Sequence, residues 1–129
     1  MARRPEDFGY VRLWTVSLAG IALISKSNSK KRYLSDDEKA FEQSVGWLAK
    51  SACGCPKLKE GWVELEPHFL TRTHPDATNL FKSLLDALVK VEIFKDDKYV
   101  GGTVPPIPIY GDANSLMHIW GPPQAPTPS

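Results

Sequence analysis

The sequence has little cysteine, little histidine and almost no excess charge. Its 129 residues include two Cys and three His, and the formal net charge is +1. Cys53 and Cys55 are separated by one glycine, which is too close for an ordinary structural disulfide and supplies half of a zinc site. We therefore expect two free thiols in a loop, an arrangement that is compatible with a reducing compartment. The net charge alone favours no class of partner.

Long apolar runs are also missing. The apolar stretch at residues 11–24 is too short to span a bilayer, and Glu6 and Asp7 do not suit the charged leader of a signal peptide. We expect a β-strand there, and no membrane as partner. Strand alternation would divide its side chains between two faces: Trp14, Val16 and Leu18 on one, and Leu13, Thr15 and Ser17 on the other.

The overall composition is that of a soluble globular protein. Apolar residues make up 42% and charged residues 24%, and the length suits one domain with its own core. The charge is uneven, because residues 1–34 hold seven Lys or Arg against two acids, and residues 61–129 hold five against eight. This pattern suits a protein that grips a polyanion with one part and binds metal with another. Surface charge scattered unevenly explains it equally well.

Two segments have helical periodicity. Asp36 to about Ala52 follows Ser35, which with Glu38 forms a capping pattern at the helix start. A second helix follows His74. Each helix has one apolar face, which we expect to comprise Phe41, Val45, Leu48 and Ala52 in the first, and Leu80, Leu84, Leu85, Ala87, Leu88 and Val91 in the second.

Further strands are predicted around the helices. Trp62 to about Thr73 alternates until Pro67 disturbs it, and Leu116–Trp120 is the last strand, with Leu116, His118 and Trp120 on one side. Gly101 and Gly102 are expected to turn the chain. The proline-interrupted segment 103–110 is expected to be an edge strand or an extended loop.

The fold predicted from these elements is a single α+β domain over residues 1–121, a mixed β-sheet packed with two principal helices. The proline-rich tail, residues 122–129, is expected to be disordered or extended. His68 and His74 have no partners at ligand spacing, so we assign neither as a metal ligand.

Two groups of polar residues are candidates for function. The basic segment 25–32 carries Lys26, Lys30, Lys31 and Arg32, which suit phosphate contacts, although a solvated loop explains them equally well. The second helix carries a polar face with a lysine at its flank, and capping plus solvation is the simplest interpretation of it. The members of this face are Asp76, Asn79, Ser83 and Asp86, with Lys82 beside them.

The segment from His74 to Val100, HPDATNLFKSLLDALVKVEIFKDDKYV, resembles the core of the RusA family of Holliday-junction resolvases. In that family an acidic motif ending in Asn precedes a helix that carries a Lys, and an Asp-Asp pair follows ahead of a strand. Asp76 and Asn79 match the motif in DATN, Lys82 matches the lysine, and Asp96 and Asp97 match the pair in KDDKYV. Asp86 falls at an acidic position of the helix.

The resemblance implies a site and a reaction. It assigns Asp76 and Asp97 as principal ligands of Mg²⁺, with Mn²⁺ as a substitute, Asp96 as an auxiliary ligand, Lys82 as the charge-stabilising group and Asn79 as a positioning residue. Arg72 joins the basic segment as a DNA contact. The implied function is Mg²⁺-dependent, paired symmetric cleavage of four-way DNA junctions by a homodimer, in the cytoplasm, on nucleoid DNA, by a protein of phage or prophage origin.

One position departs from the family pattern. The family's second acid is replaced by Thr78, which supplies no negative charge. At an effective dielectric constant of about 20, one charge roughly 4 Å from another contributes on the order of 4 kcal/mol before desolvation. The alternative is therefore a weakened or inactive junction-binding protein on the same fold, and a third interpretation is a small interaction module that resembles the family by chance.

Overall fold

The structure is a computed structural model and describes residues 4–20, 36–72, 77–96, 98–105 and 107–123. The side chains of residues 37 and 77–79 also lie outside the description. The elements in chain order are a 3₁₀-helix η1 (Pro5–Phe8), β1 (Val11–Ser17), α1 (Asp36–Cys53), β2 (Gly61–Glu66), β3 (His68–Phe69), α2 (Ala77–Lys90), β4 (Val100–Thr103), β5 (Ile109–Tyr110) and β6 (Leu116–Gly121).

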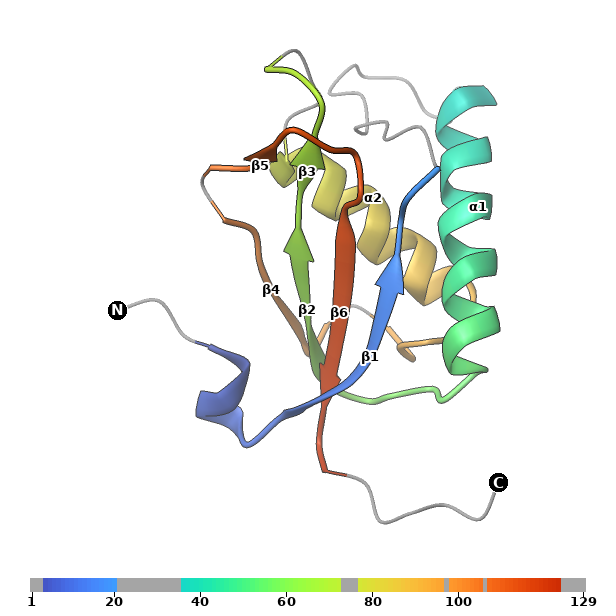
Figure 1. Cartoon of the computed structure of the whole chain (residues 1–129). Coiled ribbons are helices and arrows are strands. Elements are labelled where there is room, and N and C mark those ends of the chain that lie inside the picture. The colour runs from blue at the N-terminus through green and yellow to red at the C-terminus, as the bar shows by residue number, and fades with distance from the viewer. Residues whose placement is uncertain (1–3, 21–35, 73–76, 97, 106, 124–129) are drawn as a thin grey trace.

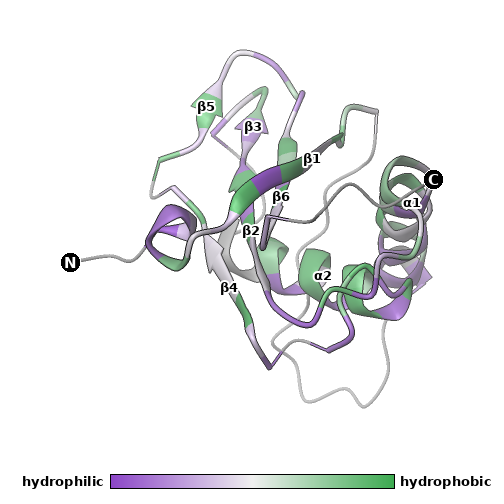
Figure 2. Ribbon diagram, turned by 90° about the horizontal axis from the view of Figure 1, so that it is seen from below, coloured by the Kyte–Doolittle hydropathy of each residue, from purple (hydrophilic) through white to green (hydrophobic). Residues whose placement is uncertain are grey.

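The described strands form a mixed four-stranded sheet with a small ribbon beyond one end. The sheet order is β1-β6-β2-β4, in which β6 is antiparallel to β1 and β2, and β4 is parallel to β2. Strands β3 and β5 form the parallel ribbon at the top of Figure 1. Both helices lie on the same side of the sheet, as the view from below in Figure 2 shows. The predicted α+β fold, a mixed sheet packed with two helices, is confirmed.

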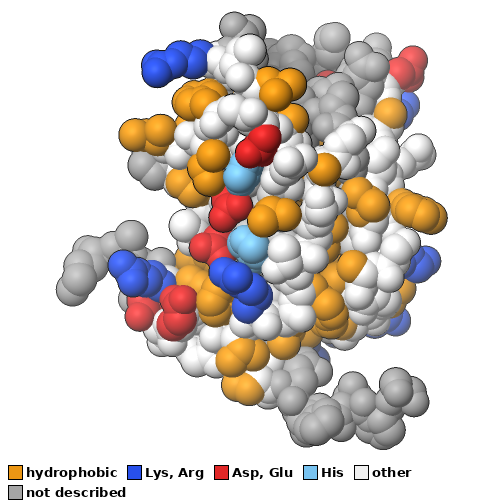
Figure 3. Space-filling view, viewed as in Figure 1, with side chains coloured by type: hydrophobic (Ala, Val, Ile, Leu, Met, Phe, Trp, Pro, Cys, Tyr) orange, Lys and Arg blue, Asp and Glu red, His pale blue; other side chains and the backbone are white. Residues whose placement is uncertain are grey.

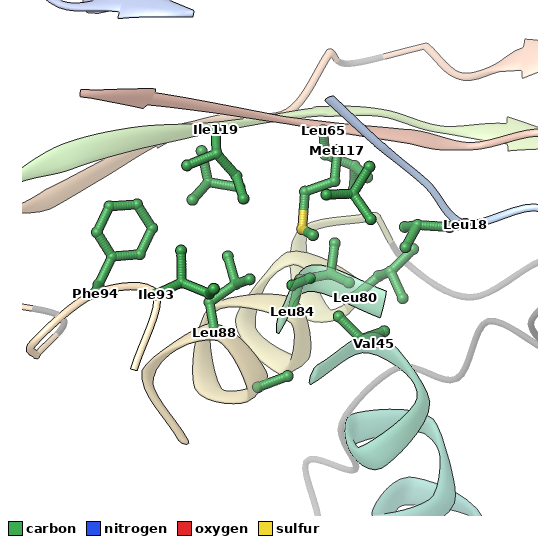
Figure 4. Close-up of a cluster of buried hydrophobic side chains, with 14 of the residues drawn as sticks. Leu18, Val45, Leu65, Leu80, Leu84, Leu88, Ile93, Phe94, Met117 and Ile119 are labelled. Carbon is green, nitrogen blue, oxygen red and sulfur yellow. The ribbon is translucent and has the colours of Figure 1, made fainter. Parts of the chain in front are cut away.

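The core lies between that side of the sheet and the helices (Figure 4). Alternate residues of β2 and β6 point toward the helices, and α2 contributes the largest helical share. The fully enclosed side chains of these three elements are Val63, Leu65, Met117, Ile119, Leu80, Leu84 and Leu88.

Helix α1 has the predicted range, but its buried face differs slightly from the predicted one. Phe41 and Val45 are buried, but the stripe continues through Ala49, and Ala52 is exposed. A Cβ at Gly46 would press on the Val91 side chain, so this glycine allows α1 and α2 to approach closely. The helix ends where predicted, because Gly54 adopts φ 72° and its amide donates to the Lys50 carbonyl at 2.8 Å.

Strand β1 contains an irregularity that changes one predicted face. Its pairing with β6 shifts register between Arg12 and Trp14. Val16 and Leu18 are buried as predicted, whereas Leu13 packs against the core beside Trp14 instead of facing away from it. A bulge inserts one extra residue, and strict alternation therefore fails across it. Ser17 is the last residue of the strand, and residues 21–24 of the predicted strand lie outside the description.

Pro67 divides the second predicted strand in two. The strand β2 ends at Glu66, and the chain passes through buried Pro67 into β3. Proline has no amide hydrogen to donate to a neighbouring strand, which favours a break in the ladder at this point. The carbonyl of Pro67 still accepts from the Ile109 amide at 2.9 Å, which joins the ribbon to the end of the sheet.

Strand β4 corrects the prediction that Gly101 and Gly102 turn the chain. Both lie within β4, opposite Trp62 and Val63 of β2. A Cβ on Gly101 would overlap the Trp62 ring, and one on Gly102 would overlap the Phe81 ring. The glycines therefore provide room for an aromatic ring on each face of an edge strand, which local turn preferences do not reveal.

Two further expectations concern membranes and thiols. Neither described helix is long and apolar enough to cross a lipid bilayer. Cys53 and Cys55 are free thiols, as predicted, but Cys53 is the last residue of α1 and not part of a loop. Burial raises the pKa of Cys53 to about 11, so this thiol stays protonated near neutral pH.

Candidate active site

The first part of the candidate site lies at the start of α2. Asp76 and the side chain of Asn79 lie outside the described residues, as does the side chain of Thr78. The helical backbone includes positions 78 and 79, and Lys82 follows on an exposed position of the helix. The prediction of a lysine-bearing helix after the acidic motif is consistent with this arrangement.

Packing holds α2 in one orientation. Leu80 and Leu84 are fully buried under the sheet, and Phe81 lies against Gly102 of β4. Lys82 is consequently on the outer side of the helix. Ser83 is buried, 4% exposed, so it does not belong to an open polar face as the helical spacing had suggested.

The second part of the site is the loop that carries Asp96. Lys95 donates its amide to the Leu58 carbonyl at 2.9 Å, and Gly61, the first residue of β2, donates to the Tyr99 carbonyl at 3.2 Å, so both ends of the loop are held near the start of β2. Asp96 is exposed, and its Oδ1 accepts the Lys98 amide at 2.7 Å. The carboxylate therefore shapes the loop immediately ahead of β4, while Asp97 lies outside the described residues.

Carboxylates are the ligands that a hard divalent cation prefers, so the chemistry of Asp76, Asp96 and Asp97 fits Mg²⁺. Within the part of the chain that the structure describes, no three His, Cys, Asp or Glu residues gather to hold a metal ion. Asp86 is half-buried, on the same helix as Lys82. Helix α2 separates the two parts of the predicted site, because its 14 residues span about 21 Å between its start at Ala77 and the loop with Asp96 (Figure 1).

The predicted DNA contacts divide between described and undescribed residues. Lys26, Lys30, Lys31 and Arg32 lie outside the description. Arg72 is exposed, and its guanidinium carbon is 5.6 Å from the centroid of the Tyr110 ring in β5. That cation–π contact joins Arg72 to the ribbon just before the acidic motif.

Sequence reasoning missed a pair of salt bridges at the end of β2, in which His68 lies between Glu66 and Asp112; we call this pair the bridge. His68 Nε2 lies 2.8 Å from Glu66 Oε2, and His68 Nδ1 lies 2.9 Å from Asp112 Oδ1. Both ring nitrogens can donate at once only in the protonated ring. Burial opposes that charge, but the hydrogen bonds and charges of Glu66 and Asp112 outweigh it and raise the pKa of His68.

The bridge fixes the chain that leads into the acidic motif. The His68 amide donates to Ser115 Oγ at 2.9 Å, which joins β3 to the residue before β6. The spacing of Glu66 and His68 on one strand face was a usable signal for half of the bridge. Asp112 is 44 positions from His68 in the sequence, so no local pattern could have identified it.

Polar groups continue along the open face of the sheet, the face away from the helices (Figure 3). His118 lies on this face and is buried, and its Nδ1 is 2.8 Å from Thr15 Oγ1. Burial and the charge of Arg12 lower the pKa of His118.

The neighbouring strand adds a second group on this face. Glu64 Oε1 accepts from Arg12 at 3.3 Å and from Trp120 Nε1 at 3.2 Å, and the Arg12 guanidinium lies 5.2 Å from the Trp120 ring centroid. The open face thus carries interlinked charges and aromatic rings instead of an apolar surface.

A comparison with protein-family models matches residues 23–114 to the family described as Endodeoxyribonuclease RusA. The match covers more than two thirds of the chain, from the basic segment through β5, and includes every predicted site residue. Strands β1 and β6 lie outside it. No curated protein matches the chain significantly.

Proposed function

Because this chain belongs to the RusA endodeoxyribonuclease family, we propose that it cleaves four-way DNA junctions by paired, symmetric, Mg²⁺-dependent hydrolysis. The observation that carries the proposal is the family match over residues 23–114, which contains the whole acidic motif, the helical lysine and the closing acid pair. The exposed position of Lys82 on the helix that follows the motif supports it.

In this proposal the carboxylates hold the metal. Asp76 and Asp97 are the principal ligands, and Asp96 contributes as an auxiliary. The bound ion would lower the pKa of a water molecule and neutralise charge on the phosphate. Mn²⁺ offers similar oxygen coordination and would substitute.

The remaining residues act on the DNA. Lys82 places a positive charge beside the phosphate as negative charge develops, and Asn79 positions the acidic motif through hydrogen bonds. Lys26, Lys30, Lys31 and Arg32 contact phosphates without reading sequence, and Arg72 extends that contact from the ribbon. The protein would act on DNA in the cytoplasm.

Paired cleavage requires two active sites. A homodimer with two-fold symmetry would present the same site to two opposed strands of a junction. We therefore propose a dimer as the active form.

Thr78 favours a second candidate, a junction-binding protein with weak or no cleavage. The missing carboxylate removes one negative charge from the motif, which would lower metal affinity. Replacing Thr78→Asp would restore that charge. A large gain in cleavage by this variant would mean that the natural chain is catalytically weakened.

Incubation of the purified protein with a labelled four-way junction, with Mg²⁺, Mn²⁺ or chelator, tests the proposal. We expect symmetric nicks that require metal, no nicks with Asp97→Asn, and a rate about 100- to 1000-fold lower with Lys82→Ala. Lys50→Ala, an exposed lysine in the last turn of α1, is the matched control and should cut normally.

The outcomes separate the candidates. Junction-selective binding without nicks in either metal would support the inactive binder. Equal binding to a junction and to a linear duplex of the same length, without cleavage, would contradict both candidates.

A further inference from the structure

A hollow on the edge of the sheet has no role in the proposed reaction. It has a volume of about 330 Å³ and lies where residues near η1, the start of β2 and the loop before β4 meet. Its aromatic lining comprises Phe8, Tyr10, Trp62 and Tyr99, and its charged lining comprises Glu60 and Lys98. The volume is within the range of about 300–1,000 Å³ that is typical of small-ligand sites.

The inner wall of the hollow is held firmly. Trp62 is 8% exposed, and its Nε1 donates to Thr103 Oγ1 at 2.7 Å. Gly101 leaves room for the indole ring, since a Cβ there would overlap it. Phe8 covers Trp62 with a centroid separation of 5.7 Å, and Tyr10 stacks on Phe8 at 5.5 Å.

The outer aromatic rings are exposed instead of filling the core. Phe8 is 45% exposed and Tyr99 is 63% exposed. Exposed aromatic rings gathered around one hollow indicate a binding surface, because they offer flat apolar area that water solvates poorly.

The charges at the rim suit a nucleotide. Lys98 is exposed, and its Nζ lies 5.6 Å from the Tyr99 ring centroid, where it can meet a phosphate. Glu60 is exposed, and burial together with the charge of Glu60 raises the pKa of the Tyr10 hydroxyl. The Glu60 carboxylate repels phosphate but accepts hydrogen bonds from N–H groups, of which every unpaired base carries at least one. The rim therefore offers a cation for the backbone and an acceptor for the base.

The hollow adjoins the candidate active site along the chain. Tyr99 follows Asp96 by three residues, so their Cα atoms are at most about 11 Å apart, roughly the length of three stacked nucleotides. The Asp96 carboxylate also accepts the Lys98 amide, so the acid and the rim of the hollow belong to one loop.

We propose that this hollow receives an unpaired, unstacked nucleobase from the DNA strand that passes Asp96, with Lys98 contacting the adjoining phosphate. The inference rests on the proposed function, which brings DNA to this loop. Aromatic side chains stack on any base because every base has a π-face, so the hollow would favour unpaired over paired DNA without reading its sequence.

Binding of a fluorescent single-stranded oligothymidylate, measured by anisotropy in chelator, tests the proposal without catalysis. We expect the dissociation constant to rise about 5- to 150-fold in Tyr99→Ala and in Phe8→Ala. Tyr99→Phe keeps the ring and should bind like the parent. Trp47→Ala removes a 70% exposed ring from α1 and is the matched control. Lys98→Ala should reduce the slope of log affinity against log salt by about 0.7.

The two proposals can fail separately. If the parent chain cuts junctions while Tyr99→Ala and Phe8→Ala bind the oligonucleotide no worse than Trp47→Ala, the hollow binds no base and the nuclease proposal stands. Loss of binding specific to these two variants would support the base site even if no junction is cut in any metal. No measurable binding by the parent chain would overturn the base site.

Discussion

At the scale of single residues, the two described histidines, His68 in the ribbon and His118 in the sheet, have opposite environments. His68 bridges two carboxylates, which raise its pKa above the usual 6.5, whereas burial and Arg12 lower the pKa of His118. Folding therefore favours the protonated form of His68 and the neutral form of His118. Their contributions to stability change with pH in opposite directions.

The bridge at His68 should stabilise the protein most in acid. Since its folded pKa is raised, the contribution is fully present below pH 6.5 and is lost as pH rises through the raised pKa. Glu66 and Asp112 are 38% and 45% exposed, so solvent screening limits the effect. We expect His68→Asn to lower the free energy of unfolding by about 1 kcal/mol more at mildly acidic than at mildly alkaline pH.

Urea denaturation of the parent protein and of His68→Asn, each at mildly acidic and at mildly alkaline pH, measures this difference. His118→Asn is the control, and its pH trend should be reversed, because the stability due to neutral His118 is lost as pH falls through its lowered pKa. If His68→Asn lowers the free energy of unfolding equally at both pH values, protonation of His68 does not contribute to stability.

At the scale of elements, β4 depends on two aromatic rings from other parts of the chain. Trp62 and Phe81 occupy the space that side chains at 101 and 102 would need. Helix α2 therefore determines the position of this edge strand through Phe81, and β2 does so through Trp62. The loop with Asp96 connects α2 to β4 and is held between them.

Gly102→Ala should destabilise the protein by about 1–3 kcal/mol, because the new methyl group would overlap the Phe81 ring. Thermal or urea unfolding measures the loss. The double variant Phe81→Ala with Gly102→Ala is the control, and its loss should be smaller than the sum of the single losses. If the two single losses of unfolding free energy add up to the loss in the double variant, the methyl group at position 102 does not clash with the Phe81 ring.

Regular periodicity made several elements predictable, and distant contacts made others unpredictable. The core face of α2 follows from spacing alone, because its buried residues recur at helical intervals, whereas alternation in β6 predicted which residues share a side but not which side faces the helices. Gly101 and Gly102 suggested a turn, since the rings that require them are distant in the sequence. Leu13 packs against the core because of a bulge in β1, and a bulge has no clear sequence signal.

The candidate site was predictable in part for a similar reason. The acidic motif, the helical lysine and the acid pair are local patterns, and the family match covers all of them. The hollow for which we propose base binding combines three separated segments, so only the folded chain shows it. The roles of Asp76, Asn79, Lys82, Asp96 and Asp97, and those of the basic DNA contacts, remain predictions.

At the scale of the whole molecule, the helices cover one side of the sheet and charged groups line the other. Association with DNA should then depend strongly on salt, through Lys and Arg residues that replace counterions at phosphates. The proposed contacts lie mainly in the basic segment, residues 25–32, and the near-neutral total charge gives little general attraction.

Replacing Lys26, Lys30, Lys31 and Arg32 together with Ala should weaken junction binding and flatten its salt dependence. If all four contact phosphates, the slope of log affinity against log salt should fall by up to about 3.6, since each contact contributes about 0.9. Filter binding over a series of salt concentrations measures the slope. A change no larger than that of Lys50→Ala would indicate that the segment is only solvated.

The parallel pairing of β2 with β4 also has a consequence for the order of folding. Gly61 pairs with Val100 only after the intervening chain, including α2, has formed its crossover. The two glycines give β4 little strand preference of its own, so its pairing should follow the docking of Phe81. We expect the β4 amides to gain protection from hydrogen exchange later than those of β6, so the loop with Asp96 would be among the last segments to be organised.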